Sequence, residues 1–197
     1  LRQVPLLRAL KRHGVPVPTI RWSGGDLRWF EVPYLMVERL PGRTFRFADP
    51  DPSFDLSPHG VAARFRQIVQ ALTQTHQLNW QQELTGWEAP RALADEIRFW
   101  DPILAKGAEP AWITQGEEVR ALLLQSIPPN APVGLFHGDF QGTNFLFDGE
   151  TLNAVLDWEI SGIGGQLLDL GWVITLADPQ SWTGLCSPIA SAPSAEE

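Results

Sequence analysis

The chain has 197 residues, of which 44% are hydrophobic and 19% charged, so we expect a packed globular core rather than a disordered chain. The formal net charge of −8 argues against a nucleic-acid-binding protein, and the single cysteine, Cys186, excludes an intrachain disulfide and a cysteine-rich zinc site. Because the sequence shows neither a membrane-spanning apolar run nor a signal peptide, we expect a cytoplasmic protein without a membrane partner.

The first 42 residues are predicted to form a helix followed by short strands. Residues 1–13 carry leucines at helical spacing, and Gly14 follows as a C-terminal stop. The prolines within residues 15–18 then favour extended backbone. Strands are predicted over Ile20–Trp22, Trp29–Val32 and the apolar run Tyr34–Val37, which is followed by Pro41-Gly42.

The middle of the chain is predicted to be mainly helical. Residues 43–57 are polar and rich in proline, which favours a loop. Ser57 as the cap and Pro58 at the first helical position begin a helix whose apolar residues repeat at helical spacing as far as His76. Two further helices are predicted, one over Arg91–Leu104 and one that begins at the capping-box pattern Thr114–Glu117 and ends near Gln125.

The last third is predicted to contain short strands and one more helix. The strands are Gly134–His137, Asn144–Phe147 and Asn153–Leu156, with Asp148-Gly149 as a hairpin turn. Gly162–Gly165 is predicted to be a flexible loop or turn, and Leu167–Leu176 a buried helix. Asp169, near the start of that helix, is interpreted as a cap or as a brace on the glycine loop. This order of elements predicts an α+β fold in two lobes.

The residues that indicate chemistry lie in the run from His137 to Asn144, directly after a predicted strand. Phosphoryl transfer needs a carboxylate that orients the acceptor hydroxyl, together with oxygen ligands for Mg²⁺ beside the phosphates. Asp139 suits the first role. Asn144 and Asp157, which the hairpin returns to the loop, suit the second. His137 is interpreted as a brace on the loop rather than a proton carrier.

The pattern His-x-Asp-x4-Asn followed by a later Asp matches the catalytic segment of protein kinases. Gly138 replaces the arginine of that segment, however, and Trp158-Glu159 follows Asp157 in place of Phe-Gly. With these departures the sequence resembles the aminoglycoside phosphotransferase and choline kinase family. The resemblance covers about residues 4–178, with supporting segments at Gly14–Pro18, Tyr34–Gly42, Leu72–His76 and Asp169-Leu170.

The resemblance implies a two-lobed, protein-kinase-like fold with most of the N-terminal lobe missing, a helical C-terminal lobe and a small catalytic hairpin sheet. In this interpretation residues 1–42 are the remnant of the N-terminal lobe, residues 43–182 the catalytic lobe, and residues 183–197 a loop that leads to a truncated helix. It also implies ATP and Mg²⁺ as cofactors and a small-molecule hydroxyl, such as that of an aminoglycoside or a choline-like alcohol, as the acceptor.

By the same resemblance, main-chain groups of a hinge would hold the adenine. These are the Glu38 carbonyl and the Leu40 amide, with Val37 facing the base. Kinases of this shape also use a glycine-rich loop and a strand lysine to contact the phosphates. The only lysines here, Lys11 and Lys106, lie outside the predicted strands, so we expect this chain alone to be inactive.

Two other functions stay open from the sequence. One is a nucleotide-binding pseudoenzyme or regulatory module. The usual sign of such a protein would be the loss of Asp139, Asn144 or Asp157, and all three are present. The other is a metal-dependent phosphoesterase that uses His137, Asp139, Asn144 and Asp157. That class generally needs more histidine or carboxylate ligands for its two metal ions than this sequence offers in one place. The sequence carries no signal for an oligomeric state.

Overall fold

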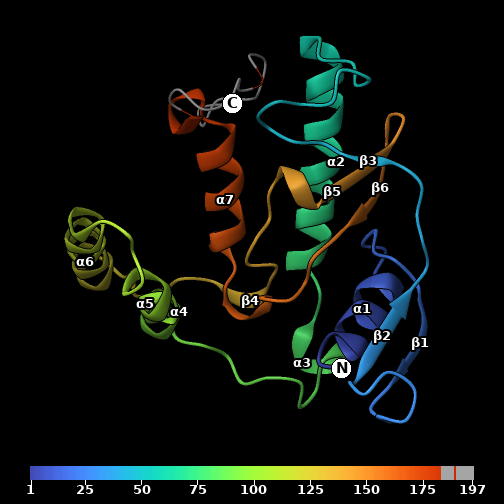
Figure 1. Ribbon diagram of the computed structural model, residues 1–197, viewed down its shortest axis with the longest axis horizontal. Helices are drawn as coiled ribbons and strands as arrows, with labels where there is room; N and C mark the ends of the chain where they lie inside the picture. Colours follow the sequence, from blue (N-terminus) through green and yellow to red (C-terminus); the bar gives the residue numbers. More distant parts are fainter. Residues whose placement is uncertain (183–188, 190–197) are drawn as a thin grey trace.

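The computed structural model describes residues 1–182 and residue 189 (Figure 1). Its α-helices are α1 (Gln3–Arg12), α2 (Pro58–His76), α3 (Trp80–Glu83), α4 (Leu93–Phe99), α5 (Asp101–Leu104), α6 (Pro110–Gln125) and α7 (Leu167–Ala177). Short 3-10 helices lie at Gly142–Asn144 (η1) and Pro179–Trp182 (η2). The strands are β1 (Ile20–Gly24), β2 (Tyr34–Val37), β3 (Arg43–Thr44), β4 (Val133–Phe136), β5 (Phe145–Asp148), β6 (Thr151–Val155) and β7 (Gly162–Gly165).

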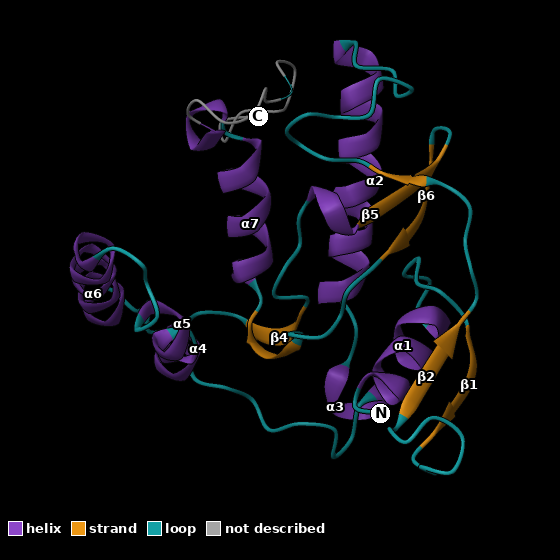
Figure 2. Ribbon diagram, viewed as in Figure 1, coloured by secondary structure: helices purple, strands orange, loops and turns teal. Residues whose placement is uncertain are grey.

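The strands form three small antiparallel sheets, with the orders β1-β2, β3-β5-β6 and β4-β7. The first sheet lies beside α1, and the other two pack against the long helix α2 (Figure 2). The predicted α+β class is therefore confirmed. No helix in the described part of the chain is both long and apolar enough to cross a membrane. The predicted tail over residues 183–197, with Cys186, lies outside the described residues apart from residue 189.

Helix α2 begins and ends where the sequence predicts. The Ser57 hydroxyl accepts a hydrogen bond from the Gly60 amide at 3.2 Å, and Pro58 occupies the first turn. The buried side chains of α2 repeat at helical spacing, and they include Val61, Phe65, Ile68 and Leu72. This apolar face packs against β4 and β6, so α2 supports the strands that carry the polar loop 137–144.

Phenylalanines join residues 43–57 to the hairpin of β5 and β6. Phe45 packs edge to face against Phe54 and Phe147, with ring centroids 5.3 and 5.7 Å away. The buried Arg64 guanidinium stacks over this cluster and donates hydrogen bonds to the carbonyls of Asp55 and Gly60. The prediction of a loop throughout 43–57 is wrong at its first two residues, because β3 pairs with β5.

The predicted strand Trp29–Val32 is wrong. These residues form an exposed turn, with Trp29 71% exposed, between the paired strands β1 and β2. The reversal begins earlier, because Asp26 accepts hydrogen bonds from both the amide and the side chain of Arg28. Glu31 then adopts a positive φ of 60°, which a strand does not permit.

The helices between α2 and β4 differ from the prediction. The expected helix over 91–104 is divided into α4 and α5, because Pro102 lacks an amide donor and its ring would clash with the carbonyl four residues earlier. Helix α6 begins at Pro110 rather than at the expected capping box, and the Thr114 hydroxyl instead donates to the Pro110 carbonyl within the helix. The short helix α3 was not predicted.

The glycine segment 162–165 is a buried strand, not a flexible loop. It pairs with β4 in the register Leu135 to Ile163, and all four of its residues are buried. A Cβ on Gly162 would lie 2.1 Å from the Arg91 Nη2 atom, so a larger residue there would displace the Arg91 guanidinium. Helix α7 is present as predicted but is only partly buried, since Leu167, Leu170 and Ile174 are exposed.

Candidate active site

The polar loop that follows β4 reverses direction at Gly138. Its φ is 88°, in the left-handed region, and a Cβ there would lie 3.0 Å from the Ile160 carbonyl oxygen. Only glycine adopts this conformation without strain. The turn leaves Asp139 half-buried, while Phe140 is inserted into the core. The sequence of the loop thus fixes where the Asp139 carboxylate lies.

Asp169 on α7 anchors the start of this loop. Its carboxylate is fully buried and accepts hydrogen bonds from the His137 amide at 2.9 Å and from the Gly138 amide at 2.8 Å. The His76 Nε2 atom lies 3.1 Å from the same carboxylate. The brace predicted for Asp169 therefore acts on the polar loop, not on residues 162–165. Sequence separation hid this role, because the bonded amides lie about thirty positions earlier.

The His137 ring joins the loop to the end of β6. It is fully buried, its Nδ1 accepts a hydrogen bond from the Asp139 amide at 3.1 Å, and its Nε2 donates to the Leu156 carbonyl at 2.8 Å. Burial lowers the pKa of His137 below its usual value, although Asp169 and other nearby carboxylates act in the opposite direction. Both contacts are compatible with the neutral ring, the form that burial favours.

Asn144 in η1 orients Asp139. Its amide nitrogen Nδ2 donates to the Asp139 carbonyl at 2.9 Å and to the Asp139 Oδ2 atom at 2.8 Å. A third donor, the Gln141 Nε2 atom, lies 3.4 Å from Oδ2. The other carboxylate oxygen, Oδ1, accepts no hydrogen bond from the described residues. Asp139 therefore presents one anchored oxygen and one open oxygen.

Asp157 follows β6 and is exposed, with a positive φ of 59°. Its neighbours in the chain are fixed by side-chain donors. The Trp158 indole donates to the Val155 carbonyl at 3.0 Å, and the Ser161 hydroxyl donates to the Trp158 carbonyl at 2.7 Å. The Asn144 carbonyl also accepts from the Leu156 amide at 2.8 Å, so the structure brings the two predicted metal ligands to adjoining segments.

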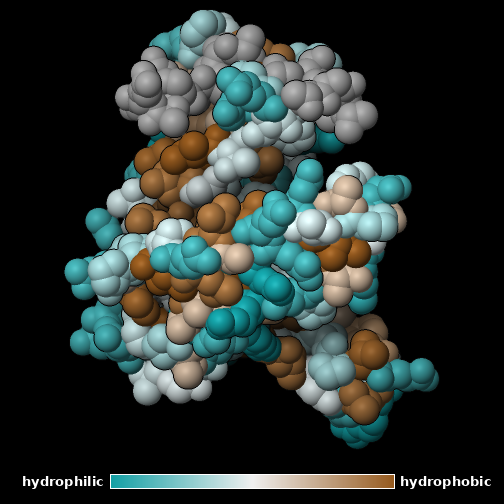
Figure 3. Space-filling model, turned by 90° about the vertical axis from the view of Figure 1, so that its left-hand side faces the viewer, coloured by the Kyte–Doolittle hydropathy of each residue, from teal (hydrophilic) through white to brown (hydrophobic). Residues whose placement is uncertain are grey.

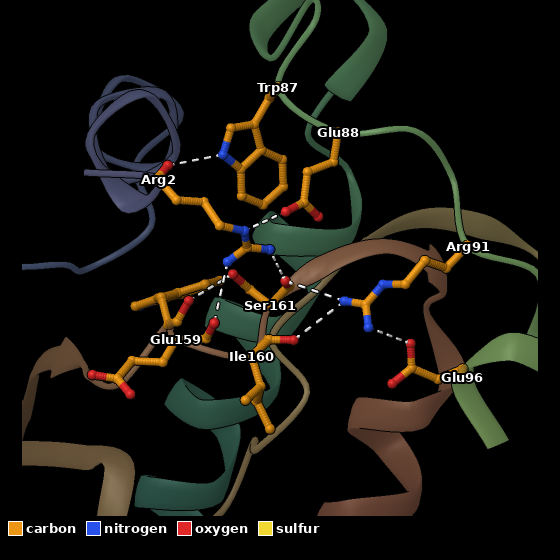
Figure 4. A network of polar contacts seen from close by, with 9 residues as sticks. Arg2, Trp87, Glu88, Arg91, Glu96, Glu159, Ile160 and Ser161 are labelled. Atoms are coloured by element: carbon orange, nitrogen blue, oxygen red, sulfur yellow. Dashed lines mark hydrogen bonds and ion pairs between the residues drawn. The ribbon is translucent and has the colours of Figure 1, made fainter. Parts of the chain in front are cut away.

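Two arginines from distant segments hold the turn after Asp157 (Figure 4). Arg2 donates to the carbonyls of Glu159, at 3.1 Å, and Ser161, and Arg91 Nη2 lies 3.4 Å from the carbonyls of both Ile160 and Ser161. Sequence reasoning missed both arginines. No local pattern could have found them, because they bind main-chain carbonyls, and every residue type carries a main-chain carbonyl.

A carboxylate balances each of these arginines. Arg2 pairs with Glu88, and the Trp87 indole donates to the Arg2 carbonyl at 2.8 Å. Arg91 Nη1 lies 2.8 Å from Glu96 Oε2, which is ion-pair range, although the geometry is not that of a hydrogen bond. Burial raises the pKa of Glu96, and Arg91 opposes that shift. Arg2, Glu88 and Arg91 line a cavity of about 440 Å³ beside the turn.

The donor set suits a hard cation such as Mg²⁺ that also binds phosphate. The nitrogen of the Asn144 amide is occupied by Asp139, which leaves its oxygen as the ligand atom. The exposed Asp157 carboxylate accepts no hydrogen bond from the described residues. Among these residues, no group of three histidine, cysteine or acidic side chains could hold a metal ion. Phosphate oxygens and water would therefore have to complete the ligand set.

The predicted hinge residues lie at the end of β2. Val37 is exposed, and the Glu38 side chain turns back to accept a hydrogen bond from the Thr19 amide at 2.8 Å. The Glu38 carbonyl and the Leu40 amide make no hydrogen bond with the described residues, so both main-chain groups are available to a ligand. Of the two lysines, Lys11 lies in α1 and donates to the Val17 carbonyl, and Lys106 follows α5.

Comparison with known proteins identifies relatives along most of the chain. Acyl-CoA dehydrogenase family member 11 of Pongo abelii is 30% identical over 179 residues, which are 86% of this chain, and the chain spans 22% of that protein. The crystal structure of an aminoglycoside-3'-phosphotransferase of type VIII is 25% identical, with a TM-score of 0.63. It covers 97% of this chain, which spans 68% of that chain.

A third similar structure is that of a thermostable aminoglycoside phosphotransferase mutant in a ternary complex with AMP-PNP and hygromycin B. It has a TM-score of 0.61 and 18% identity, covers 85% of this chain, and is covered to 59% of its own length. This likeness shows the fold, which is the kinase-like fold predicted from the sequence. The model of the phosphotransferase enzyme family matches residues 1–191. The chain therefore belongs to the phosphotransferase enzyme family.

Proposed function

We propose that the full-length protein transfers the γ-phosphoryl group of ATP to a hydroxyl of a small molecule, with Asp139 as the catalytic carboxylate. One observation carries this proposal: Asp139 has one oxygen anchored by Asn144 at 2.8 Å and the other open, on a loop tied at its start to Asp169. A carboxylate held in this way can accept the hydrogen bond of an alcohol in one orientation.

Each residue then has a defined task. The open Oδ1 atom of Asp139 accepts the proton of the alcohol as its oxygen bonds to phosphorus. The bond between that phosphorus and the β–γ bridging oxygen breaks, its electron pair leaves with ADP, and the proton passes from Asp139 to solvent. The oxygens of Asn144 and Asp157 would hold a Mg²⁺ ion, which would supply positive charge beside the phosphates.

His137 has a positioning task in this scheme. Its ring keeps the Asp139 amide and the Leu156 carbonyl at fixed places, and its lowered pKa favours the neutral form. For adenine, we propose the main-chain groups of Glu38 and Leu40, with Val37 against the base. Support for a nucleotide donor comes from the AMP-PNP bound by the similar phosphotransferase, and support for a small-molecule acceptor comes from its hygromycin B.

The decisive experiment replaces Asp139 by asparagine in the full-length protein. We expect kcat to fall by about 10²–10⁴, the contribution of a positioned general base, while nucleotide affinity changes little. The matched control is Asp148→Asn, which makes the same change on an exposed carboxylate of the neighbouring hairpin. Turnover by Asp139→Asn at the rate of that control would refute the assignment.

A further inference from the structure

Two neighbouring cavities lie among helices α4, α5, α6 and α7, and one of them reaches the polar loop. The inner cavity, of about 340 Å³, reaches the loop itself, since Gly138 forms part of its wall. Its other walls come from the end of α4 and from α7, and they include Glu96, Trp100, Leu168, Gly171 and Trp172. A molecule bound there would therefore contact Gly138, which directly precedes Asp139 in the chain.

The outer cavity, of about 330 Å³, continues from the inner one between α4, α5 and α6. Glu96, Trp100 and Leu168 line both cavities. The remaining walls are mainly aliphatic, and they include Leu93, Ile97, Leu104, Val119 and Leu123. Hydrophobic surface gathers on the side of the molecule that carries these helices and α7 (Figure 3). A ligand that extends away from Asp139 would thus meet hydrocarbon side chains.

Both carboxylates that line these cavities are already paired. Glu96 lies 2.8 Å from the Arg91 Nη1 atom, and Asp101 accepts a hydrogen bond from the Arg120 Nη1 atom at 3.0 Å. Although the whole chain has a net charge of −8, neither of these carboxylates offers an unpaired negative charge to a ligand. A polycation such as an aminoglycoside, with several ammonium groups, would have to bury them against aliphatic walls and compete with the two arginines, which is unfavourable.

We infer that the acceptor of this protein is an apolar alcohol, whose hydrocarbon chain or ring fills the two adjoining cavities and whose hydroxyl lies at the Gly138 end. The role of that hydroxyl rests on the proposed function. The alcohol oxygen forms the new bond to phosphorus, its proton goes to Asp139, and ADP leaves. Affinity then depends on the length of the hydrocarbon, because each buried methylene tightens binding by about fourfold.

The test measures binding to the 197-residue chain without nucleotide. The probes are 6-bromo-1-hexanol, 8-bromo-1-octanol and 10-bromo-1-decanol, whose bromine quenches tryptophan fluorescence on contact, and Trp100 and Trp172 line the inner cavity. We expect saturable quenching, with the dissociation constant falling by about fifteenfold for each step of two methylenes until the cavities are full. The double variant Trp100→Phe, Trp172→Phe should lose most of the quenching.

Gly171 provides a matched pair of variants. It lies within α7, and a Cβ there would meet no atom within 4 Å, so a larger side chain can enter the inner cavity without a clash. Gly171→Leu should weaken bromodecanol binding at least tenfold. Gly171→Ala, which changes helix propensity in the same direction but adds only a methyl group, should change it less than threefold.

Three results would overturn the inference: no saturable quenching, equal binding by the two Gly171 variants, or tighter binding of kanamycin than of bromodecanol in competition. Self-association of the chain that excludes the probe would also overturn it, by assigning the surface to a second copy. Binding of the alcohol without phosphoryl transfer in the full-length protein would support an apolar ligand site in these cavities, but it would overturn the acceptor role of the alcohol together with the proposed function. Phosphoryl transfer to a polycation, without alcohol binding, would support the proposed function and contradict the inference.

Discussion

The His137 ring makes two hydrogen bonds that a phenylalanine ring cannot make, and this permits a sharp test of its positioning role. His137→Phe keeps an aromatic ring beside Trp158, whose centroid lies 4.5 Å away, but leaves the Asp139 amide and the Leu156 carbonyl without their partner. Each partly buried group left unsatisfied costs about 1–1.5 kcal/mol, so we expect a loss of about 2–3 kcal/mol in the free energy of unfolding.

The assay is thermal and urea unfolding followed by circular dichroism. For a chain of this length, a loss of 2–3 kcal/mol corresponds to a fall in Tm of about 5–10 °C. The control is His59→Phe at the exposed start of α2, where a change within about 0.5 kcal/mol is expected. In the full-length protein, His137→Phe should lower kcat far more than it raises the KM for ATP, because the ring contacts the loop and not the hinge.

The pH dependence gives a second signature of the same ring. The pKa of His137 is lowered in the folded chain, so its stabilising effect is fully present above the unfolded pKa of about 6.5 and is lost as the pH falls below it. The negative charges of Asp169, Asp139 and Asp157 reduce the shift in the pKa of His137 without reversing it. The stability difference between the wild type and His137→Phe should therefore shrink below pH 6.5, by up to about 1.4 kcal/mol per pH unit. A difference that is constant from pH 7.5 to 5.5, or smaller than that of His59→Phe, would refute the reasoning.

Three further predictions concern the metal, the turn and the chain itself. Calorimetric titration of the full-length protein with Mg²⁺ should show tight binding only when nucleotide is present, because Asn144 and Asp157 supply too few ligands alone; equally tight binding without nucleotide, or full activity of Asp157→Ala, would contradict this. Arg91→Lys should raise the Mg²⁺ concentration needed for half-maximal activity several-fold, since a single ammonium cannot hold the carbonyls of Ile160 and Ser161 and also pair with Glu96. The control is Arg98→Lys at an exposed position. Equal Mg²⁺ dependence of the two variants would exclude a role for Arg91. The 197-residue chain should bind Mg-ATP weakly and transfer no phosphate, because neither of its lysines lies on a strand; micromolar affinity with measurable turnover would defeat this prediction.

The sequence predicted best where local chemistry decides the structure. Helix α2 could be placed from Ser57 and Pro58, because a cap and a first-turn proline act within one turn of the chain. The order of His137, Asp139, Asn144 and Asp157 identified the family, because that spacing is tied to one chemistry. Their roles as site residues stay predictions, to be tested by the variants described above.

The failures arose where distant residues decide the structure. Gly162–Gly165 suggests a flexible loop when considered alone, yet it is a strand because β4 pairs with it and because Arg91 fills the space that its missing side chains leave. The burial of α7 was overestimated, because helical spacing shows an apolar face and not what covers it. Asp169 was recognised as a brace, but its partners His137 and Gly138 depend on the tertiary fold.

The cavity walls and the polar loop come from different parts of the chain. Apart from Arg91, the segment that includes α4, α5 and α6 contributes no described hydrogen bond to the loop 137–144 or to the turn 158–161. Those segments are fixed instead by Asp169, His137, Arg2 and their own side chains. Substitutions at Leu93, Ile97, Leu104 or Val119 can therefore reshape the space for an acceptor while the machinery of transfer keeps its geometry. Under the proposed function, such a division would let single mutations change which acceptor binds to the full-length protein without disturbing the contacts of Asp139.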